Sequence, residues 1–134
     1  MRSAAVVAIA AAAGVAGCGG TAGDLLSITV SGGPGAAAAK HTLVVSGDGR
    51  GSCDRGKLGA LESQRVIEAR EIEREARKLA RDAASYPERP GARRYALSTN
   101  DGVVRWSEGN PALPNVLPRA QLLALQLQRE LCSS

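Results

Sequence analysis

Residues 93–108, RRYALSTNDGVVRWSE, carry the strongest local indication of the fold. The Asn100-Asp101-Gly102 run is typical of a tight hairpin turn, because these residues tolerate the backbone angles that such turns require. Apolar side chains alternate with polar ones on both sides of the turn, at Tyr95 and Leu97 before it and at Val104 and Trp106 after it. A period of two with aromatic and β-branched residues indicates strands with one buried face. The stretch therefore predicts a hairpin of strands 93–98 and 103–108.

A second hairpin is expected nearer the start of the chain. Leu26, Ile28 and Val30 alternate with Ser and Thr, and Leu43 and Val45 do the same within residues 42–46. Ser31-Gly32-Gly33-Pro34-Gly35 lies between them and cannot continue a central strand, because proline lacks the backbone donor and glycine favours turns. These patterns predict strands at 26–31 and 42–46 joined by a long loop. Residues 47–59 contain five glycines and Cys53, and we expect them to form a loop.

Two helices are predicted from apolar stripes with helical spacing. The first spans residues 58–84, with Arg65 interrupting a stripe of Leu, Ile and Ala and with charged residues on the remaining faces. The second spans residues 118–131, where Pro118 suits a first helical turn and Leu residues dominate. The predicted order is β-β-α-β-β-α. Paired strands with helices on one side indicate a two-layer α+β domain, with a four-stranded antiparallel sheet packed against two helices.

The first residues have the pattern of an export signal. Arg2 is followed by a short run of Ala, Val and Ile that ends in small residues. The Val15-Ala16-Gly17-Cys18 run resembles the lipobox of bacterial lipoproteins, in which cleavage precedes a cysteine that carries diacylglycerol. The resemblance implies a signal-peptide helix at 1–17, a flexible tether at 18–23 and one domain at 24–134. An ordinary signal peptide and a buried Ala-rich helix remain the alternatives.

The lipobox resemblance also implies a location. Cys18 would be the site of lipidation and would anchor the protein to the membrane on its extracytoplasmic face, in the bacterial cell envelope. An anchor with two or more acyl chains binds a membrane stably.

The expected export of the chain determines how the other two cysteines are interpreted. With Cys18 lipidated, Cys53 and Cys132 remain, and two cysteines in an exported chain most simply form one disulfide. Two buried free thiols are the alternative. A zinc site is not expected, because structural zinc takes four Cys or His ligands and His41 is the single histidine.

Charge and motifs exclude several classes of function. The chain has 17 basic and 13 acidic residues, a net charge of +4, with signs that alternate along one segment. This excess does not indicate a nucleic-acid partner or a polybasic membrane patch. Residues 48–52, Asp-Gly-Arg-Gly-Ser, lack the Gly-Lys-Ser/Thr ending of a phosphate-binding loop and the ligands of a calcium loop, so a surface turn is expected. No cofactor is predicted.

The sequence does not predict an enzyme. Nucleophilic catalysis by Ser or Cys usually needs a base. His41 lies at a strand start without a neighbouring acid or nucleophile in sequence, and its expected place is an exposed strand edge. Cys53 and Cys132 are better explained by each other than as nucleophiles.

The domain resembles the emfourin family of small protease inhibitors. The resemblance rests on residues 28–33 (Ile-Thr-Val-Ser-Gly-Gly), a central helix, the Tyr95-x-Leu97 strand, the Asp101-Gly102 turn, and Pro114 and Pro118 before a Leu-rich helix. The lipobox, the Gly-rich segment around Cys53, and Cys132 lie outside this pattern. The resemblance implies a protein-binding module that inhibits secreted, thermolysin-like metalloproteases.

Two functions therefore remain as expectations. In the first, a binding loop at Ser31, Gly32, Gly33, Pro34 and Gly35, or a second glycine-rich loop at Gly47–Gly56, contacts a secreted protease or another envelope protein. In the second, the protein is a structural or accessory envelope lipoprotein without inhibitory activity.

Overall fold

The computed structural model describes residues 23–33 and 40–132. The expected signal peptide, the lipobox with Cys18, most of the tether, and Pro34 and Gly35 of the expected loop lie outside these residues. The described elements are, in chain order, β1 (Asp24–Gly32), β2 (His41–Ser46), β3 (Arg50–Cys53), β4 (Gly59–Ala60), α1 (Ser63–Arg81), β5 (Arg93–Thr99), β6 (Gly102–Ser107) and α2 (Val116–Leu131).

The strands form one antiparallel sheet in the order β4-β3-β2-β1-β5-β6. The α+β class is confirmed, and both expected hairpins are present as β1–β2 and β5–β6. They join edge to edge, since Ile28 of β1 lies opposite Leu97 of β5. The prediction of four strands was wrong, because the described residues form a sheet of six. The predicted order β-β-α-β-β-α was wrong for the same reason, since two further strands precede α1.

The two additional strands lie in the Gly-rich segment that was expected to be a loop. β3 pairs with β2, and the short β4 pairs with β3. Glycine has low strand propensity, but Gly51 is required here by its surroundings. A Cβ atom at Gly51 would lie 2.9 Å from Cδ1 of Leu131 and 3.1 Å from Leu61. The last turn of α2 therefore packs directly on the backbone of β3.

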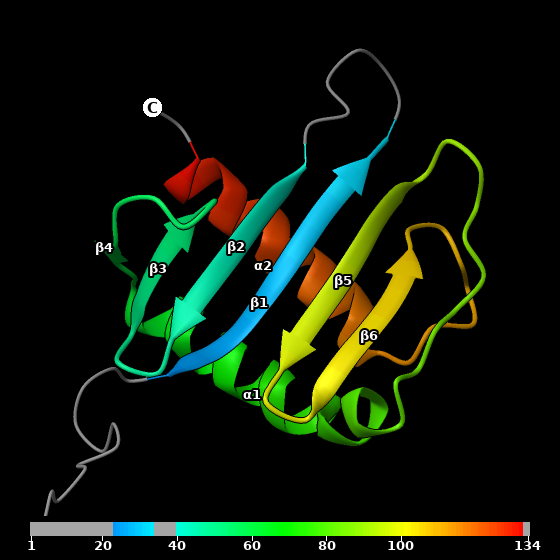
Figure 1. Cartoon of the computed structure of the whole chain (residues 1–134), viewed down its shortest axis with the longest axis horizontal. Helices are drawn as coiled ribbons and strands as arrows, with labels where there is room; N and C mark the ends of the chain where they lie inside the picture. Colours follow the sequence, from blue (N-terminus) through cyan, green and yellow to red (C-terminus); the bar gives the residue numbers. More distant parts are fainter. Residues whose placement is uncertain (1–22, 34–39, 133–134) are drawn as a thin grey trace, which may run out of the picture.

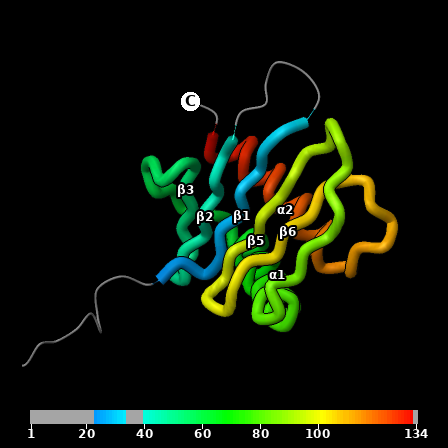
Figure 2. The backbone as a smooth tube through the Cα atoms, turned by 45° about the vertical axis from the view of Figure 1, so that its right-hand side comes forward, coloured from blue at the N-terminus to red at the C-terminus, as the bar shows by residue number. Residues whose placement is uncertain are grey.

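Both helices cover the same face of the sheet (Figure 1), and Figure 2 shows the same two layers from another angle. The core lies between the layers. Every second residue of the central strands is buried there, including Ile28, Leu43 and Leu97, each fully shielded from solvent. The helices contribute Ile72 of α1 and a row of Leu and Ala from α2. In β1 and β5 this alternation is the one that the sequence predicted for one-sided strands. In β2, Val44 and Ser46 are buried as well.

Helix α1 is shorter than predicted at both ends, since it spans Ser63–Arg81 and Ala83 has φ = +51°, a left-handed conformation that ends a helix. It begins at Ser63, because residues 59–60 pair with β3 instead of continuing the apolar stripe of a helix. Two carboxylates of α1 accept hydrogen bonds from α2. Arg119 of α2 donates to Glu71 at 3.0 Å and to Glu75 at 2.7 Å. Helix α2 begins two residues before the predicted Pro118. Among the described residues, neither helix has the length and apolar content needed to cross a membrane.

The turn between β5 and β6 packs against the end of α1. Gly102 has φ = +150°, a conformation that side chains rarely adopt, and a Cβ atom there would collide with the carbonyl oxygen of Ala80. Gly102 is therefore required both by the backbone conformation of the turn and by the close contact with the end of α1.

Candidate functional site

The face of the sheet opposite the helices carries small side chains. No described helix packs on it, and the strands present it toward the viewer in Figure 1. Its residues are those that alternate with the core positions. Most are small: Ser27, Thr29 and Ser31 of β1, Thr42 and the buried Val44 of β2, Ala96 and Ser98 of β5, and Val103 of β6. Arg94 of β5 and Arg105 of β6 are the long side chains among them. A face of this kind allows another chain to approach the sheet closely.

A hollow of about 210 Å³ lies on this face over β1, β5 and β6. Thr29, Ser31 and Ala96 form its floor, and the long side chains of Lys40, Glu88, Arg94 and Arg105 line it. Glu88 is supplied by the segment after α1, which follows the outer edge of β6. There the backbone N–H of Tyr86 donates to the carbonyl of Arg105, and that of Arg105 donates to Ala84.

A second hollow of about 400 Å³ adjoins the first, and the two share Glu88 and Arg94. It is lined by Gly32, Gly33 and residues 88–92. We call the two hollows together the basic groove. Ser31, Gly32 and Gly33 of the expected binding loop line this groove, whereas Pro34 and Gly35 lie outside the described residues.

Glycines 32 and 33 leave space that arginine side chains occupy. Both have positive φ, +73° and +111°. A Cβ atom at Gly32 would lie 3.6 Å from Nε of Arg94, and one at Gly33 would lie 3.7 Å from Nε of Arg93. Gly32 is the last residue of β1 and pairs with Arg93, and an arginine side chain lies against each of the two glycines.

The groove is positively charged. Four cationic side chains, those of Lys40, Arg89, Arg94 and Arg105, line it together with one carboxylate, Glu88. Arg94 and Glu88 form an exposed ion pair at 3.4 Å, and such pairs contribute little stability. Arg89 donates to the carbonyl of Gly109. Within the described residues, Lys40 and Arg105 have no ion-pair partner, so both charges are available to a ligand.

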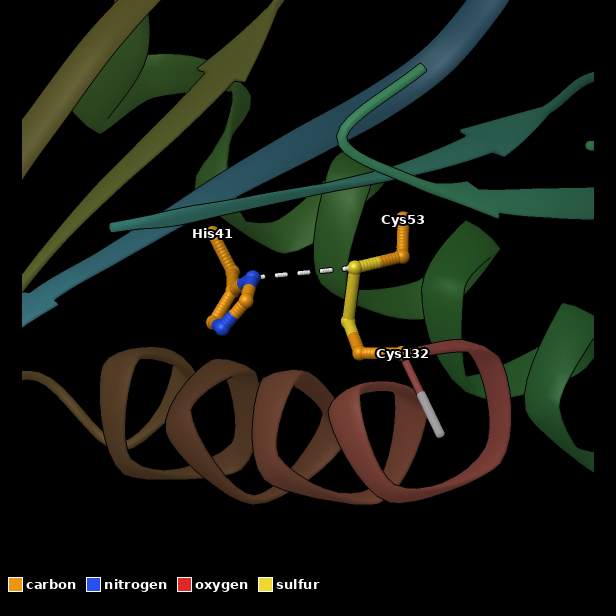
Figure 3. Close-up of side chains that lie close together, drawn as sticks. All are labelled: His41, Cys53 and Cys132. Atoms are coloured by element: carbon orange, nitrogen blue, oxygen red, sulfur yellow. Dashed lines mark hydrogen bonds between the residues drawn. A yellow bond between two sulfur atoms is a disulfide. The ribbon is translucent and has the colours of Figure 1, made fainter. Parts of the chain in front are cut away.

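A second cluster surrounds the disulfide. Cys53 at the end of β3 and Cys132, which caps α2, are bonded with Cα atoms 5.3 Å apart, as the cysteine count predicted. Figure 3 shows His41 beside this bond, with the ring directed at the sulfur of Cys53. The His41 Nδ1 atom lies 3.8 Å from that sulfur and 2.8 Å from Oδ2 of Asp54.

The β2–β3 hairpin brings these residues together. The backbone N–H of Asp54 donates to the carbonyl of Thr42 at 2.7 Å, and the N–H of Thr42 donates to Oδ1 of Asp54 at 2.8 Å. The pKa of the Asp54 carboxyl lies below its usual value, chiefly because of this Thr42 donor and secondly because of its hydrogen bond with His41. The cluster was not predictable without β3, because the pairing of β3 with β2 brings Cys53 and Asp54 beside His41.

The expected position of His41 was therefore wrong. Strand β2 lies inside the sheet between β3 and β1, and the His41 side chain is 27% exposed. An acid and a sulfur that are distant in sequence both lie beside the ring. They contact the same nitrogen, so His41 does not relay a proton between them, and Cys53 is held in the disulfide. The prediction that the protein is not an enzyme stays a prediction.

Comparisons with known proteins found no matching family model, no matching curated protein and no matching solved structure.

Proposed function

We propose that this protein is a lipid-anchored module of the cell envelope that binds another protein through the basic groove. The observation that carries the proposal is the convergence of three cationic side chains, Lys40, Arg94 and Arg105, around a floor of small residues that no described helix covers, with Arg89 in the adjoining hollow. Charged groups around a binding surface select partners of opposite charge and accelerate their association. The partner that fits this surface is an acidic, extended segment of an envelope protein.

The floor of the groove favours an extended segment over a folded one. Thr29 and Ser31 place hydroxyl groups there, and Ala96 adds little bulk. Small side chains allow the backbone of a bound peptide to lie near the sheet, where hydroxyl groups can exchange hydrogen bonds with it. Arginine adds bidentate contacts to carboxylates, which are shorter and stronger than neutral hydrogen bonds.

We expect the Arg94→Glu and Arg105→Glu double variant to bind an acidic peptide at least tenfold more weakly than the wild type. The reason is that the variant removes two cations and places two carboxylates where the peptide's own carboxylates must lie. Fluorescence anisotropy with a labelled Asp- and Glu-rich peptide measures the affinity, at two salt concentrations because surface electrostatics are screened.

A matched control is Arg74→Glu with Lys78→Glu, which makes the same change in charge on exposed positions of α1. This helix lies on the other side of the sheet, so the control should bind like the wild type. Equal losses in both variants would show that net charge alone attracts the peptide, and the groove would then not be the binding site. Pull-downs from detergent-solubilised membranes with the same variants would identify the natural partner.

The membrane anchor is tested separately at Cys18. We expect Cys18→Ala to release the protein from the membrane fraction or to leave it unprocessed, because the acyl chains have no other attachment point in the lipobox. Fractionation followed by mass determination of the product measures both outcomes. A variant that stays in the membrane at its mature mass would contradict the lipobox interpretation.

Protease inhibition is the narrower form of this proposal. It is supported by the emfourin resemblance and by the position of Ser31, Gly32 and Gly33 along the groove. The test is an inhibition assay. The rate of peptide hydrolysis by thermolysin-like metalloproteases and by serine proteases is measured with increasing amounts of the protein. Absence of inhibition at micromolar protein, together with retained peptide binding, would favour an accessory envelope lipoprotein.

A further inference from the structure

The cluster around the disulfide contains four side chains that metals of the zinc class bind. His41, Cys53 and Cys132 each offer one ligand atom, and these atoms lie within 4.8 Å of one another. Oδ2 of Asp54 lies 2.8 Å from Nδ1 of His41 and 3.6 Å from the sulfur of Cys53. Thiolate, imidazole and carboxylate are the three ligand types of protein zinc sites.

We propose that reduction of the Cys53–Cys132 disulfide creates a site for Zn²⁺ formed by Cys53, Cys132, His41 and Asp54. The protein would then have two alternative states of the same four residues, one closed by a disulfide and one closed by a metal ion.

The distances already present support a tetrahedral site. With Zn–S bonds of about 2.3 Å and Zn–N or Zn–O bonds of about 2.0 Å, tetrahedral zinc holds a sulfur about 3.5 Å from a nitrogen or oxygen ligand. The sulfur of Cys53 lies 3.8 Å from Nδ1 of His41 and 3.6 Å from Oδ2 of Asp54. His41 and Asp54 need to separate by about 0.5 Å to take up ligand positions. The Asp54 carboxylate must also approach the sulfur of Cys132, because among the described residues the group of ligand atoms within 4.8 Å of one another comprises His41, Cys53 and Cys132.

The two sulfur atoms must separate further. They are bonded in this structure, whereas two thiolates on one zinc ion lie about 3.8 Å apart. Cys53 and Cys132 are both partly exposed, and Cys132 occupies the end of a helix, where the backbone adapts more readily than in the interior. Asp54 is held toward the site by its hydrogen bond from Thr42, which fixes the orientation of a ligating carboxylate.

The chemistry is a two-electron reduction followed by ligand exchange. A dithiol reductant supplies two electrons and two protons, the S–S bond breaks into two thiols, and the reductant becomes a disulfide. Zinc then displaces both thiol protons to solvent, because the thiolate is the metal ligand. A disulfide oxidant reverses the sequence by thiol–disulfide exchange: it accepts the two electrons and becomes a pair of thiols, the Cys53–Cys132 bond forms again, and the metal is released.

Cobalt(II) is the probe for this site, because it takes the place of zinc and absorbs visible light. The protein is the full chain with Cys18→Ser, so that Cys53 and Cys132 are its remaining cysteines, and this chain is the wild type of the cobalt and zinc experiments. After reduction and removal of the reductant, we expect one cobalt ion per chain with a thiolate-to-cobalt charge-transfer band. The oxidised chain should show no such band.

The variants distinguish metal binding by a folded four-residue site from metal binding by two reactive thiols alone. His41→Ala should weaken cobalt binding at least tenfold, and Asp54→Ala should weaken it severalfold. Asp82→Ala, an exposed acidic residue at the end of α1, should leave it unchanged. Wild-type affinity in His41→Ala, or no stoichiometric binding by the reduced chain, would overturn the proposal.

A second measurement does not depend on the optical signal. Zinc should slow the reaction of the reduced thiols with a disulfide reagent at least tenfold in the wild type, because a metal-bound thiolate is shielded from attack. In His41→Ala the protection should be largely lost. Equal reaction rates with and without zinc in the wild type would also overturn the proposal, whether the reduced chain is folded or not.

Discussion

Replacing both Cys53 and Cys132 with serine is expected to lower the free energy of unfolding by about 4 kcal/mol. The bond joins residues 79 positions apart, and in the chain-entropy model a loop of this length constrains the unfolded chain by about 4.5 kcal/mol. Urea denaturation of the variant and of the wild type, both in a metal chelator, measures the difference. The chelator is needed because zinc binding would itself stabilise a reduced chain.

The matched control is the wild type with its disulfide reduced, which should unfold at the same urea concentration as the double-serine variant. A loss below about 1 kcal/mol would show that the helix α2 and strand β3 stay associated in the unfolded state without the bond, contrary to the entropic account.

Trp106→Ala is expected to cost about 4 kcal/mol, within the range for removing a buried tryptophan from a core. The Trp106 side chain is 1% exposed and stacks on Tyr95, with ring centroids 5.5 Å apart. Its Nε1–H group donates to Oε1 of Gln121 in α2 at 2.8 Å. The substitution therefore removes the contact between β6 and α2 and leaves the Gln121 amide without its donor.

Because Trp106 is the single tryptophan of the chain, far-UV circular dichroism must follow the unfolding of the variant. Trp106→Phe is the companion variant. It keeps most of the apolar volume but loses the hydrogen bond, so we expect a loss of about 1–2 kcal/mol. Similar losses in both variants would show that the hydrogen bond to Gln121, and not the packed ring, provides most of the stabilisation.

The hairpins and helices were predictable because each has a local physical cause. Alternating apolar residues such as Ile28 and Val30 define a buried strand face independently of which element packs on it. The Asn100-Asp101-Gly102 run favours a turn through its own backbone preferences. The disulfide was predictable for a different reason. Two remaining cysteines allow a single pairing, so the number of cysteines is enough and no structural information is needed.

Strands β3 and β4 were not predictable in this way. Residues such as Gly51 have little strand propensity of their own, and β3 forms because β2 offers a free edge and Leu61 and Leu131 pack against its backbone. The start of α1 was wrong for the same reason, since pairing with β3 takes residues 59–60 out of the helical stripe.

The candidate sites show the same distinction between features with a local cause and features that depend on tertiary structure. The sequence alone determined the α+β class, the two main hairpins, the disulfide pair and the glycine-rich end of β1 at Gly32–Gly33, because each follows from neighbouring residues or from composition. Tertiary structure alone decided that Lys40, Arg94 and Arg105 line one groove and that Asp54 lies beside His41. These residues are separated by up to 65 positions in sequence. Strand pairing and the choice of a single covered face bring them together, and neither depends on residues that are adjacent in the chain.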